Sequence, residues 1–163
     1  MRRLSIVLAV IGLGLVAAAP GALAARRPLP KLATGAVPGY APAYAVRPHT
    51  VWFTADGTGI LGRIANDVGA VGKRPGFLHW TTWTRTGANG LATLWYKSGG
   101  GVGRFQRTTA SVTLSDAREG HFVKMTIGSG VFGVEVWCNY NGFTYWEPAP
   151  GMAGRRCPGP YSQ

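Results

Sequence analysis

The sequence predicts an all-β protein, an antiparallel sandwich or small barrel with at most one short helix. Short runs of β-branched and aromatic residues recur from Thr50 onward, and glycine-rich or polar segments separate them. The runs are evenly spaced, which is typical of an antiparallel meander. Only residues 63–71 have a helical pattern, and Gly69 inside that segment weakens it.

The N-terminal segment reads as an export signal. Arg2 and Arg3 precede an apolar stretch, and Ala22 and Ala24 supply the small residues that a signal peptidase requires. We therefore expect a signal peptide of residues 1–24, cleaved after Ala24, and a secreted, extracellular protein. An uncleaved membrane anchor is the alternative, but the apolar stretch is short for a bilayer span of about 20 residues.

The remaining chain divides into three parts. Residues 25–48 contain five prolines and many alanines without periodicity, which predicts a disordered arm. Residues 49–146 are expected to form a single β domain, and residues 147–163 a tail rich in proline and glycine. Because an exported protein with two cysteines usually oxidises them, Cys138 and Cys157 are predicted to form a disulfide that tethers this tail.

Seven segments of the chain are expected to be strands. They are residues 50–54, 77–84, 90–97, 110–115, 121–127, 131–139 and 143–146. The Asn89-Gly90 pair favours a hairpin turn between the second and third strands. Residues 98–103 and 116–120 are expected to be two further turns.

Alternation along two of these strands predicts which side chains face the solvent. In residues 131–138 one face carries Phe132, Val134, Val136 and Cys138 and is expected to be buried; the opposite face carries Glu135 and Trp137. Trp80 and Trp83 are an odd number of residues apart, so they point to opposite faces unless a bulge intervenes. Trp83 and Trp137 are therefore candidates for exposure.

Two segments resemble small secreted proteins of actinomycetes. They are FLHWTTWTRTGANGLATLW (residues 77–95) and ASVTLSDAREGHFVKMTIG (residues 110–128). Those proteins combine a Trp-x-x-Trp strand, a glycine-rich turn and later V-T-L and F-x-x-M strands. The resemblance implies export and a β fold and implies no catalytic residue. Many of those proteins have extra cysteines near the second hairpin, where this chain has residues 98–103 and no cysteine.

The chain is strongly basic. It has 17 Lys and Arg against 6 Asp and Glu, and removal of Arg2 and Arg3 with the signal peptide would leave a net charge of +9. Such a field attracts anionic surfaces in a salt-dependent way. The alternative is that the charge serves only solubility, because the basic residues form no continuous block.

Motifs that would indicate catalysis or cofactor binding are weak. Gly57, Gly59 and Gly62 match G-x-G-x-x-G, but the long helix and later acid of a dinucleotide site are missing, so we interpret the match as a turn. The three histidines lie on separate segments without metal-ligand spacing. No G-x-S-x-G nucleophile motif is present. No metal or cofactor is predicted.

The sequence therefore favours a non-catalytic secreted domain that associates with an anionic cell-wall polymer or polysaccharide. Trp83 and Trp137, with Arg85, Arg107 and Glu135, are the candidate binding residues, as an aromatic platform flanked by charge. Nucleic acid is disfavoured because no motif for it is present. Two alternatives stay open: a small secreted hydrolase acting on polysaccharide through carboxylates such as Glu135, and a protein-binding or inhibitor module. No transmembrane segment is expected after cleavage.

Overall fold

The computed structural model describes residues 27–35, 43–64, 72–97, 103–139, 146–151 and 153–158. Within these ranges the chain forms ten strands and no helix, which confirms the all-β prediction. The predicted signal peptide lies outside the described residues. So does most of the predicted helix, and Ile64 at its start instead forms a β-bridge with Arg74. No helix in the described ranges is long and apolar enough to cross a membrane.

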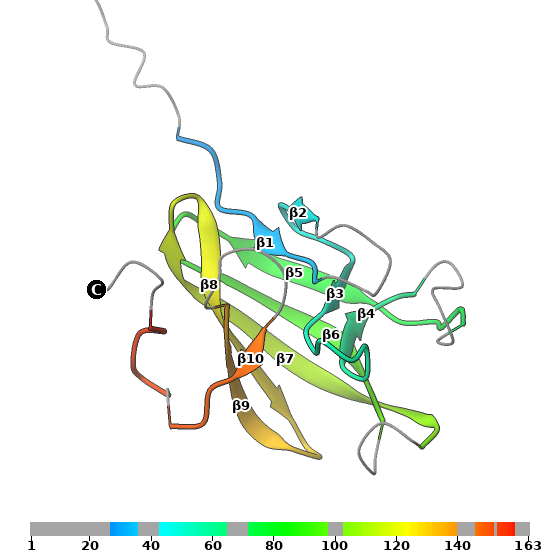
Figure 1. The fold of residues 1–163 in the computed structure, drawn as a ribbon. Coiled ribbons are helices and arrows are strands. Elements are labelled where there is room, and N and C mark those ends of the chain that lie inside the picture. The colour runs from blue at the N-terminus through cyan, green and yellow to red at the C-terminus, as the bar shows by residue number, and fades with distance from the viewer. Residues whose placement is uncertain are drawn as a thin grey trace, which may run out of the picture.

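Eight strands form one antiparallel sheet. They are β3 (Thr50–Trp52), β4 (Ile60–Gly62), β5 (Leu78–Trp83), β6 (Ala88–Lys97), β7 (Phe105–Arg118), β8 (His121–Ser129), β9 (Gly133–Cys138) and β10 (Glu147–Pro148). Their order is β10-β9-β8-β7-β6-β4-β3, and β5 also pairs with β6. A second, two-stranded sheet pairs β1 (Leu32–Ala33) with β2 (Tyr44–Ala45). The large sheet is strongly twisted and curls toward a half-barrel (Figure 1).

The concave side of the curled sheet holds the core, and we call it the inner face. Burial alternates along β6 from Ala88 to Ala92 and along β7 from Thr109 to Leu114, with the buried residues turned inward. Small residues lie opposite each other at the centre, where Ala92 pairs with Ala110. Ala92 and Ala110 belong to the same core cluster as the large indoles of Trp83 and Trp146.

A β-bulge brings Trp80 and Trp83 to the same face. The register of β5 against β6 shifts between Trp80 and Thr82, so one extra residue separates the two indoles. Their rings meet edge to face, with centroids 4.8 Å apart. The indole N–H of Trp83 donates to the carbonyl of Pro30, 3.0 Å away, and the side chain is buried. The predicted exposure of Trp83 is therefore wrong, because the bulge cancels the odd spacing.

The N-terminal segment is part of the fold where the structure describes it. Leu32 has no exposed surface, and the amide of Lys31 donates to the carbonyl of Gly120 across 2.8 Å. The carbonyl of Ala33 accepts a hydrogen bond from the indole of Trp146. The prediction of a disordered arm over residues 25–48 is thus wrong for residues 27–35 and 43–48. Proline removes backbone donors but keeps its carbonyl, and the indole of Trp83 uses that acceptor at Pro30.

The hairpin between β5 and β6 turns earlier than the Asn-Gly pair predicts. Asn89 and Gly90 both lie inside β6, and the turn runs from Thr84 to Gly87, whose carbonyl accepts from the Thr84 amide. Gly90 is needed in the strand because a Cβ there would come within 2.6 Å of the His79 carbonyl oxygen. Gly90 is therefore explained by the close approach of β5 and not by a turn.

Candidate anion-binding site

A single left-handed residue, Asp116, changes the face of β7. Leu114 points into the core, and Ala117 packs against the same core although it is three residues further on. Asp116 between them has φ of 55°, a conformation that aspartate tolerates better than most residues. On the paired strand β8, Phe122 and Met125 also lie three residues apart and both pack in the inner core, so the alternation of faces is interrupted there too. The two consecutive residues between Leu114 and Ala117 are consequently turned away from the core, and one of them is Asp116.

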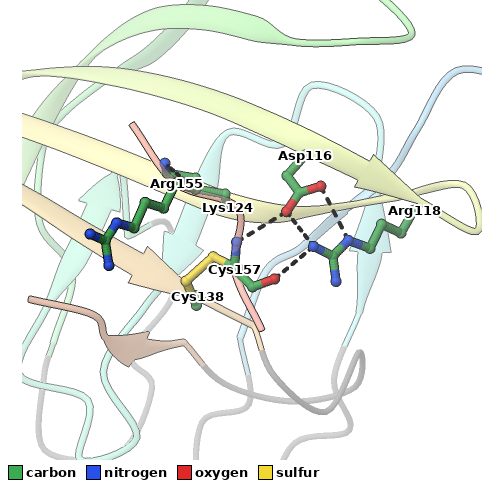
Figure 2. Close-up of a disulfide and its surroundings, with 6 residues drawn as sticks. All are labelled: Asp116, Arg118, Lys124, Cys138, Arg155 and Cys157. Carbon is green, nitrogen blue, oxygen red and sulfur yellow. Dashed lines mark hydrogen bonds and ion pairs between the residues drawn. A yellow bond between two sulfur atoms is a disulfide. The ribbon is translucent and has the colours of Figure 1, made fainter. Parts of the chain in front are cut away.

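A disulfide fastens the C-terminal tail to this outer face. Cys138 at the end of β9 is bonded to Cys157 in the tail, as the sequence predicts (Figure 2). Both sulfurs belong to a small buried cluster with Val123, Val136 and Ala149. The tail thus covers β8 and β9 from outside, while the main core lies on the other side of the sheet.

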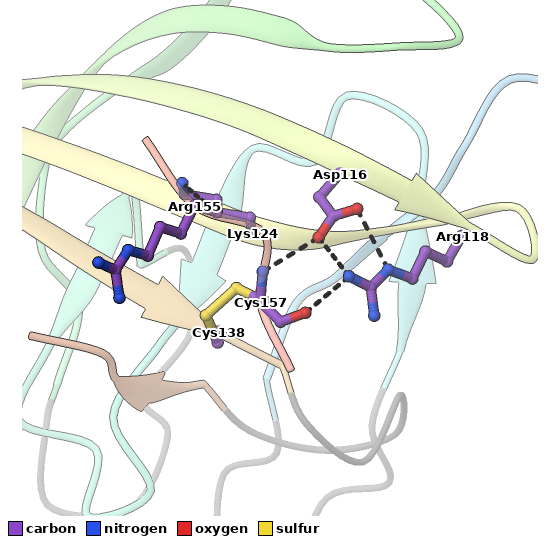
Figure 3. Close-up of polar contacts among 6 residues, drawn as sticks. All are labelled: Asp116, Arg118, Lys124, Cys138, Arg155 and Cys157. Atoms are coloured by element: carbon purple, nitrogen blue, oxygen red, sulfur yellow. Dashed lines mark hydrogen bonds and ion pairs between the residues drawn. A yellow bond between two sulfur atoms is a disulfide. The ribbon is translucent and has the colours of Figure 1, made fainter. Parts of the chain in front are cut away.

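Asp116 holds the tail by charge and hydrogen bonds. Its carboxylate accepts from Nε and Nη2 of Arg118, at 3.1 and 2.7 Å, and from the amide of Cys157, at 3.1 Å (Figure 3). Arg118 also donates to the carbonyl of Cys157. Nearby, the ammonium of buried Lys124 donates to the carbonyl of Arg155 across 2.6 Å. These bonds fix the main chain of residues 155–157.

The tail and the sheet enclose an open cleft of about 630 Å³, which we call the basic cleft. Its charged lining residues are Arg85, Asp116, Arg118, Lys124, Arg155 and Arg156. Asp116 is the only carboxylate among the described lining residues, and it is already paired with Arg118. Five cations against one acid give the lining a formal charge of +4. The side chains of Arg85, Arg155 and Arg156 are exposed to solvent.

Of the two arginines that the sequence proposes as binding residues, only one reaches this cleft. Arg85 lies in the cleft and donates one hydrogen bond to the carbonyl of Arg27. Arg107 lies on β7 with its guanidinium 5.8 Å from the ring centroid of Trp95, and it lines a separate depression beside Phe77. The two depressions share no described residue, so Arg85 and Arg107 do not form one site.

The predicted solvent face of β9 is wrong at its C-terminal end. Trp137 is buried and packs edge to face on Phe53, with ring centroids 4.7 Å apart. Phe132 and Val134, which alternation places inside, are exposed. The reason is that the core and the tail cover both faces of the C-terminal half of β9, and leave its N-terminal half uncovered. Strand alternation cannot predict a strand that is buried on both sides.

Glu135 is half-buried and lies away from the basic cleft. It lines a cavity of about 120 Å³ together with Tyr96, Lys97 and Phe132. The indole N–H of Trp137 is buried and has no hydrogen-bond partner within the described residues. Glu135 is the only carboxylate among the described residues that line this cavity. A glycosidase site requires two carboxylates, so the cavity does not supply that chemistry.

An exposed aromatic platform is not formed by the described residues. Five of the six indoles are buried: Trp52, Trp83, Trp95, Trp137 and Trp146. Trp80 is partly buried, and its N–H donates to the carbonyl of Pro48. Across the described ranges, no three His, Cys, Asp or Glu side chains are grouped so that they could hold a metal ion. The described tryptophans therefore do not form the binding platform that the sequence predicts.

Sequence reasoning missed four of the five cations of the basic cleft. Arg155 and Arg156 immediately precede a cysteine of the predicted disulfide, and this adjacency was the available signal. Guanidinium groups present paired donors that match phosphate and carboxylate oxygens, so the cleft can bind an anion without any chemical step. Comparison with known proteins found no matching family, no matching curated protein and no matching solved structure.

Proposed function

We propose that this protein is a non-catalytic, exported domain that binds an anionic extracellular polymer through the basic cleft. The observation that carries the proposal is the lining of that cleft, where five cations face one carboxylate that is already paired. Acidic cell-wall polymers and acidic polysaccharides offer repeated phosphate or carboxylate groups. Such groups are the ones that arginine binds with two parallel hydrogen bonds.

Preorganisation supports the cleft over the rest of the basic surface. The Cys138–Cys157 disulfide and the bond from Lys124 to the Arg155 carbonyl hold the main chain beside Arg155 and Arg156. Neither arginine has an acidic partner among the described residues. A binding site whose backbone is already ordered loses less entropy when its ligand arrives. Scattered surface cations have no such advantage.

Export supports the extracellular part of the proposal. The first 24 residues have the pattern of a signal peptide, and a disulfide persists in oxidising compartments. The resemblance to small secreted actinomycete proteins points in the same direction. Mass spectrometry of the protein from culture medium tests this part, with an N-terminus at Ala25 as the expected result. An intact Met1 in the medium would contradict it.

The binding experiment compares two double variants that lose the same charge. Arg155→Ser/Arg156→Ser removes two cations from the basic cleft, whereas Arg63→Ser/Arg107→Ser removes two exposed cations elsewhere. The probes are polygalacturonate and inorganic polyphosphate, with neutral dextran as the reference. We expect the cleft variant to bind the anionic probes at least about tenfold more weakly, and the control variant to change affinity by less than about twofold.

Salt provides a second readout of the same experiment. Binding to both anionic probes should weaken steeply as sodium chloride rises from about 0.05 to about 0.5 M, because the screening length falls severalfold. Equal losses in the two double variants would show that only net charge matters and would overturn the proposed site. Preference for single-stranded DNA over both probes would assign the cleft to nucleic acid instead.

A further inference from the structure

The turn between β8 and β9 exposes three apolar side chains. Val131, Phe132 and Val134 are 53%, 44% and 71% exposed, and we call them the apolar tip. They fall within four consecutive residues. A cluster of apolar side chains on the surface of a soluble protein usually marks an interaction site.

The turn holds these side chains in place. The amide of Phe132 donates to the hydroxyl of Ser129 across 3.1 Å, and Gly133 adopts a φ of 71°. The ring of Phe132 packs edge to face on Tyr96, with centroids 4.7 Å apart. This contact fixes one side of the ring and leaves the other side in solvent. The apolar tip is thus presented outward by an ordered turn.

Cations accompany the apolar tip. Lys97 at the end of β6 lines the same cavity as Phe132, and its ammonium lies 4.9 Å from the ring centroid of Phe105. Arg104 is exposed and directly precedes β7. The start of β7 and the β8–β9 turn lie at the same end of the molecule (Figure 1). Two acids accompany these cations: Glu135 is half-buried in the cavity that Lys97 lines, and the exposed Asp56 is hydrogen-bonded to Thr58, which lines the same cavity.

The apolar tip is distinct from the basic cleft. Lys124 near the start of β8 lines the cleft, whereas Ser129 at the end of β8 begins the turn that carries the tip. No described residue belongs to both. An interaction at the tip therefore goes beyond the proposed binding of a polymer and does not depend on it.

We propose that the apolar tip docks on the surface of an anionic lipid bilayer. Aliphatic and aromatic side chains can enter the boundary between headgroups and acyl chains, while neighbouring Lys and Arg remain at the anionic headgroups. The charge of the chain complements such a surface. Insertion of the apolar side chains and attraction of the cations to the headgroups are each weak alone, and reversible binding to a membrane surface requires both.

A second copy of this chain fits the tip less well. Two copies that both carry a large positive charge repel each other. Strand addition at β9 is also restricted, because β10 already pairs with Trp137 and Cys138. Among the described residues, only Gly133–Val136 of that edge lack a neighbouring strand, and the Val136 carbonyl already accepts a hydrogen bond from the Ala149 amide. An edge of this length offers too few hydrogen bonds for stable pairing.

The test measures binding to sucrose-loaded vesicles by sedimentation. Vesicles of phosphatidylcholine are compared with vesicles that also contain phosphatidylglycerol, which supplies the negative charge. The tip variant is Val131→Ser/Phe132→Ser. Its matched control is Leu91→Ser/Phe77→Ser, which removes one aliphatic and one aromatic side chain of similar exposure from elsewhere on the sheet. Circular dichroism in the near ultraviolet verifies that each variant retains the fold.

We expect the tip variant to partition onto the anionic vesicles at least about tenfold less than the wild type, and the control to change by less than about twofold. At about 0.1 M salt, where charge attraction to the headgroups persists, Arg155→Ser/Arg156→Ser should partition onto the anionic vesicles more strongly than the tip variant, because its apolar tip is intact. Unchanged partition of the tip variant would overturn the proposal. So would self-association that disappears in the tip variant without vesicles, because a second copy would then cover the tip.

Discussion

Asp116 and Cys157 are 41 residues apart in sequence, and the Cys157 amide donates a 3.1 Å hydrogen bond to the Asp116 carboxylate. The same carboxylate neutralises Arg118, so Asp116 connects the strand β7 to the tail next to the disulfide. The Asp116 carboxylate therefore holds the tail against the sheet at the basic cleft, and its oxygens are occupied by Arg118 and the Cys157 amide. The left-handed backbone of Asp116 is what turns the carboxylate toward the tail.

Asp116→Asn should destabilise the fold without distorting the backbone, because asparagine also tolerates the left-handed conformation. The variant loses the ion pair with Arg118 and weakens the bond from Cys157. Because the Arg118 side chain is 31% exposed, solvent screens part of this loss. We expect the free energy of unfolding to fall by about 1–2 kcal/mol, measured by urea denaturation.

Glu119→Gln is the matched control for this variant. Glu119 also has a positive φ, is exposed, and makes no ion pair with the described residues. Its amidation should change the free energy of unfolding by less than about 0.5 kcal/mol. Equal effects of the two amidations would show that the contact between Asp116 and the tail contributes nothing specific.

Cys138→Ser/Cys157→Ser should weaken both the fold and the basic cleft. The bridge joins cysteines 19 residues apart, and the chain-entropy account gives a loss of roughly 3 kcal/mol for a loop of this length. Without the bridge, residues 155–156 lose their covalent anchor and keep only the hydrogen bonds between the tail and Lys124, Asp116 and Arg118, so affinity for polyphosphate should fall as well. Urea denaturation and a binding titration on the same preparation measure the two effects.

Combining this change with Asp116→Asn tests whether the two anchors act together. Because both fix the same segment of tail, the combined loss of stability should be smaller than the two separate losses added. Strict additivity would mean that the bridge and the carboxylate stabilise separate parts of the molecule.

The central strands were predictable because their patterns are long. β6 to β9 have six or more residues each, rich in β-branched and aromatic side chains, and β7 alternates clearly from Thr109 to Leu114. β1, β2 and β4 have two or three residues, which is too short for alternation to be detected. The bulge after Trp80 inserts one residue and leaves no mark in composition, and therefore the assignment of Trp83 failed.

The candidate site was less predictable than the fold. Asp116 and Arg155 are brought together only by tertiary structure, and the positive φ of Asp116 is not visible in the residue types. The cysteine pair was readable, because the number of cysteines and the expected compartment together favour a bridge. Arg85 was selected for its charge, and the structure gives it four cationic neighbours in the cleft.

Leu32→Ala tests whether the N-terminal segment belongs to the folded domain. Leu32 has no exposed surface and lies in the main core cluster, so truncation should lower the free energy of unfolding by about 2–5 kcal/mol. Leu29→Ala is the control, because Leu29 is 38% exposed and should lose less than about 1 kcal/mol. Urea denaturation distinguishes the two. A disordered arm would instead make both truncations neutral.

Asp56→Asn should change the response of the protein to acid. Partial desolvation raises the pKa of Asp56, but hydrogen bonds from the hydroxyl and amide of Thr58 and from Thr54 outweigh it, so the pKa lies below its ordinary value of 3.8. A depressed pKa means that folding favours the ionised form. The stabilisation is therefore complete above the unfolded pKa and is lost as pH falls through the folded pKa.

The Asp56 carboxylate is exposed, so solvent screening limits its contribution at neutral pH to less than about 1 kcal/mol. Wild type should exceed Asp56→Asn in stability by a constant amount between about pH 5 and 7, and the difference should shrink below about pH 4. Thr58→Ala should move the Asp56 pKa upward, because it removes the hydroxyl donor 2.7 Å from the carboxylate. Carbon-detected NMR titration of Asp56 measures that shift directly. A midpoint above 3.8 in the wild type would contradict the assignment, because the hydrogen bonds would then fail to offset desolvation.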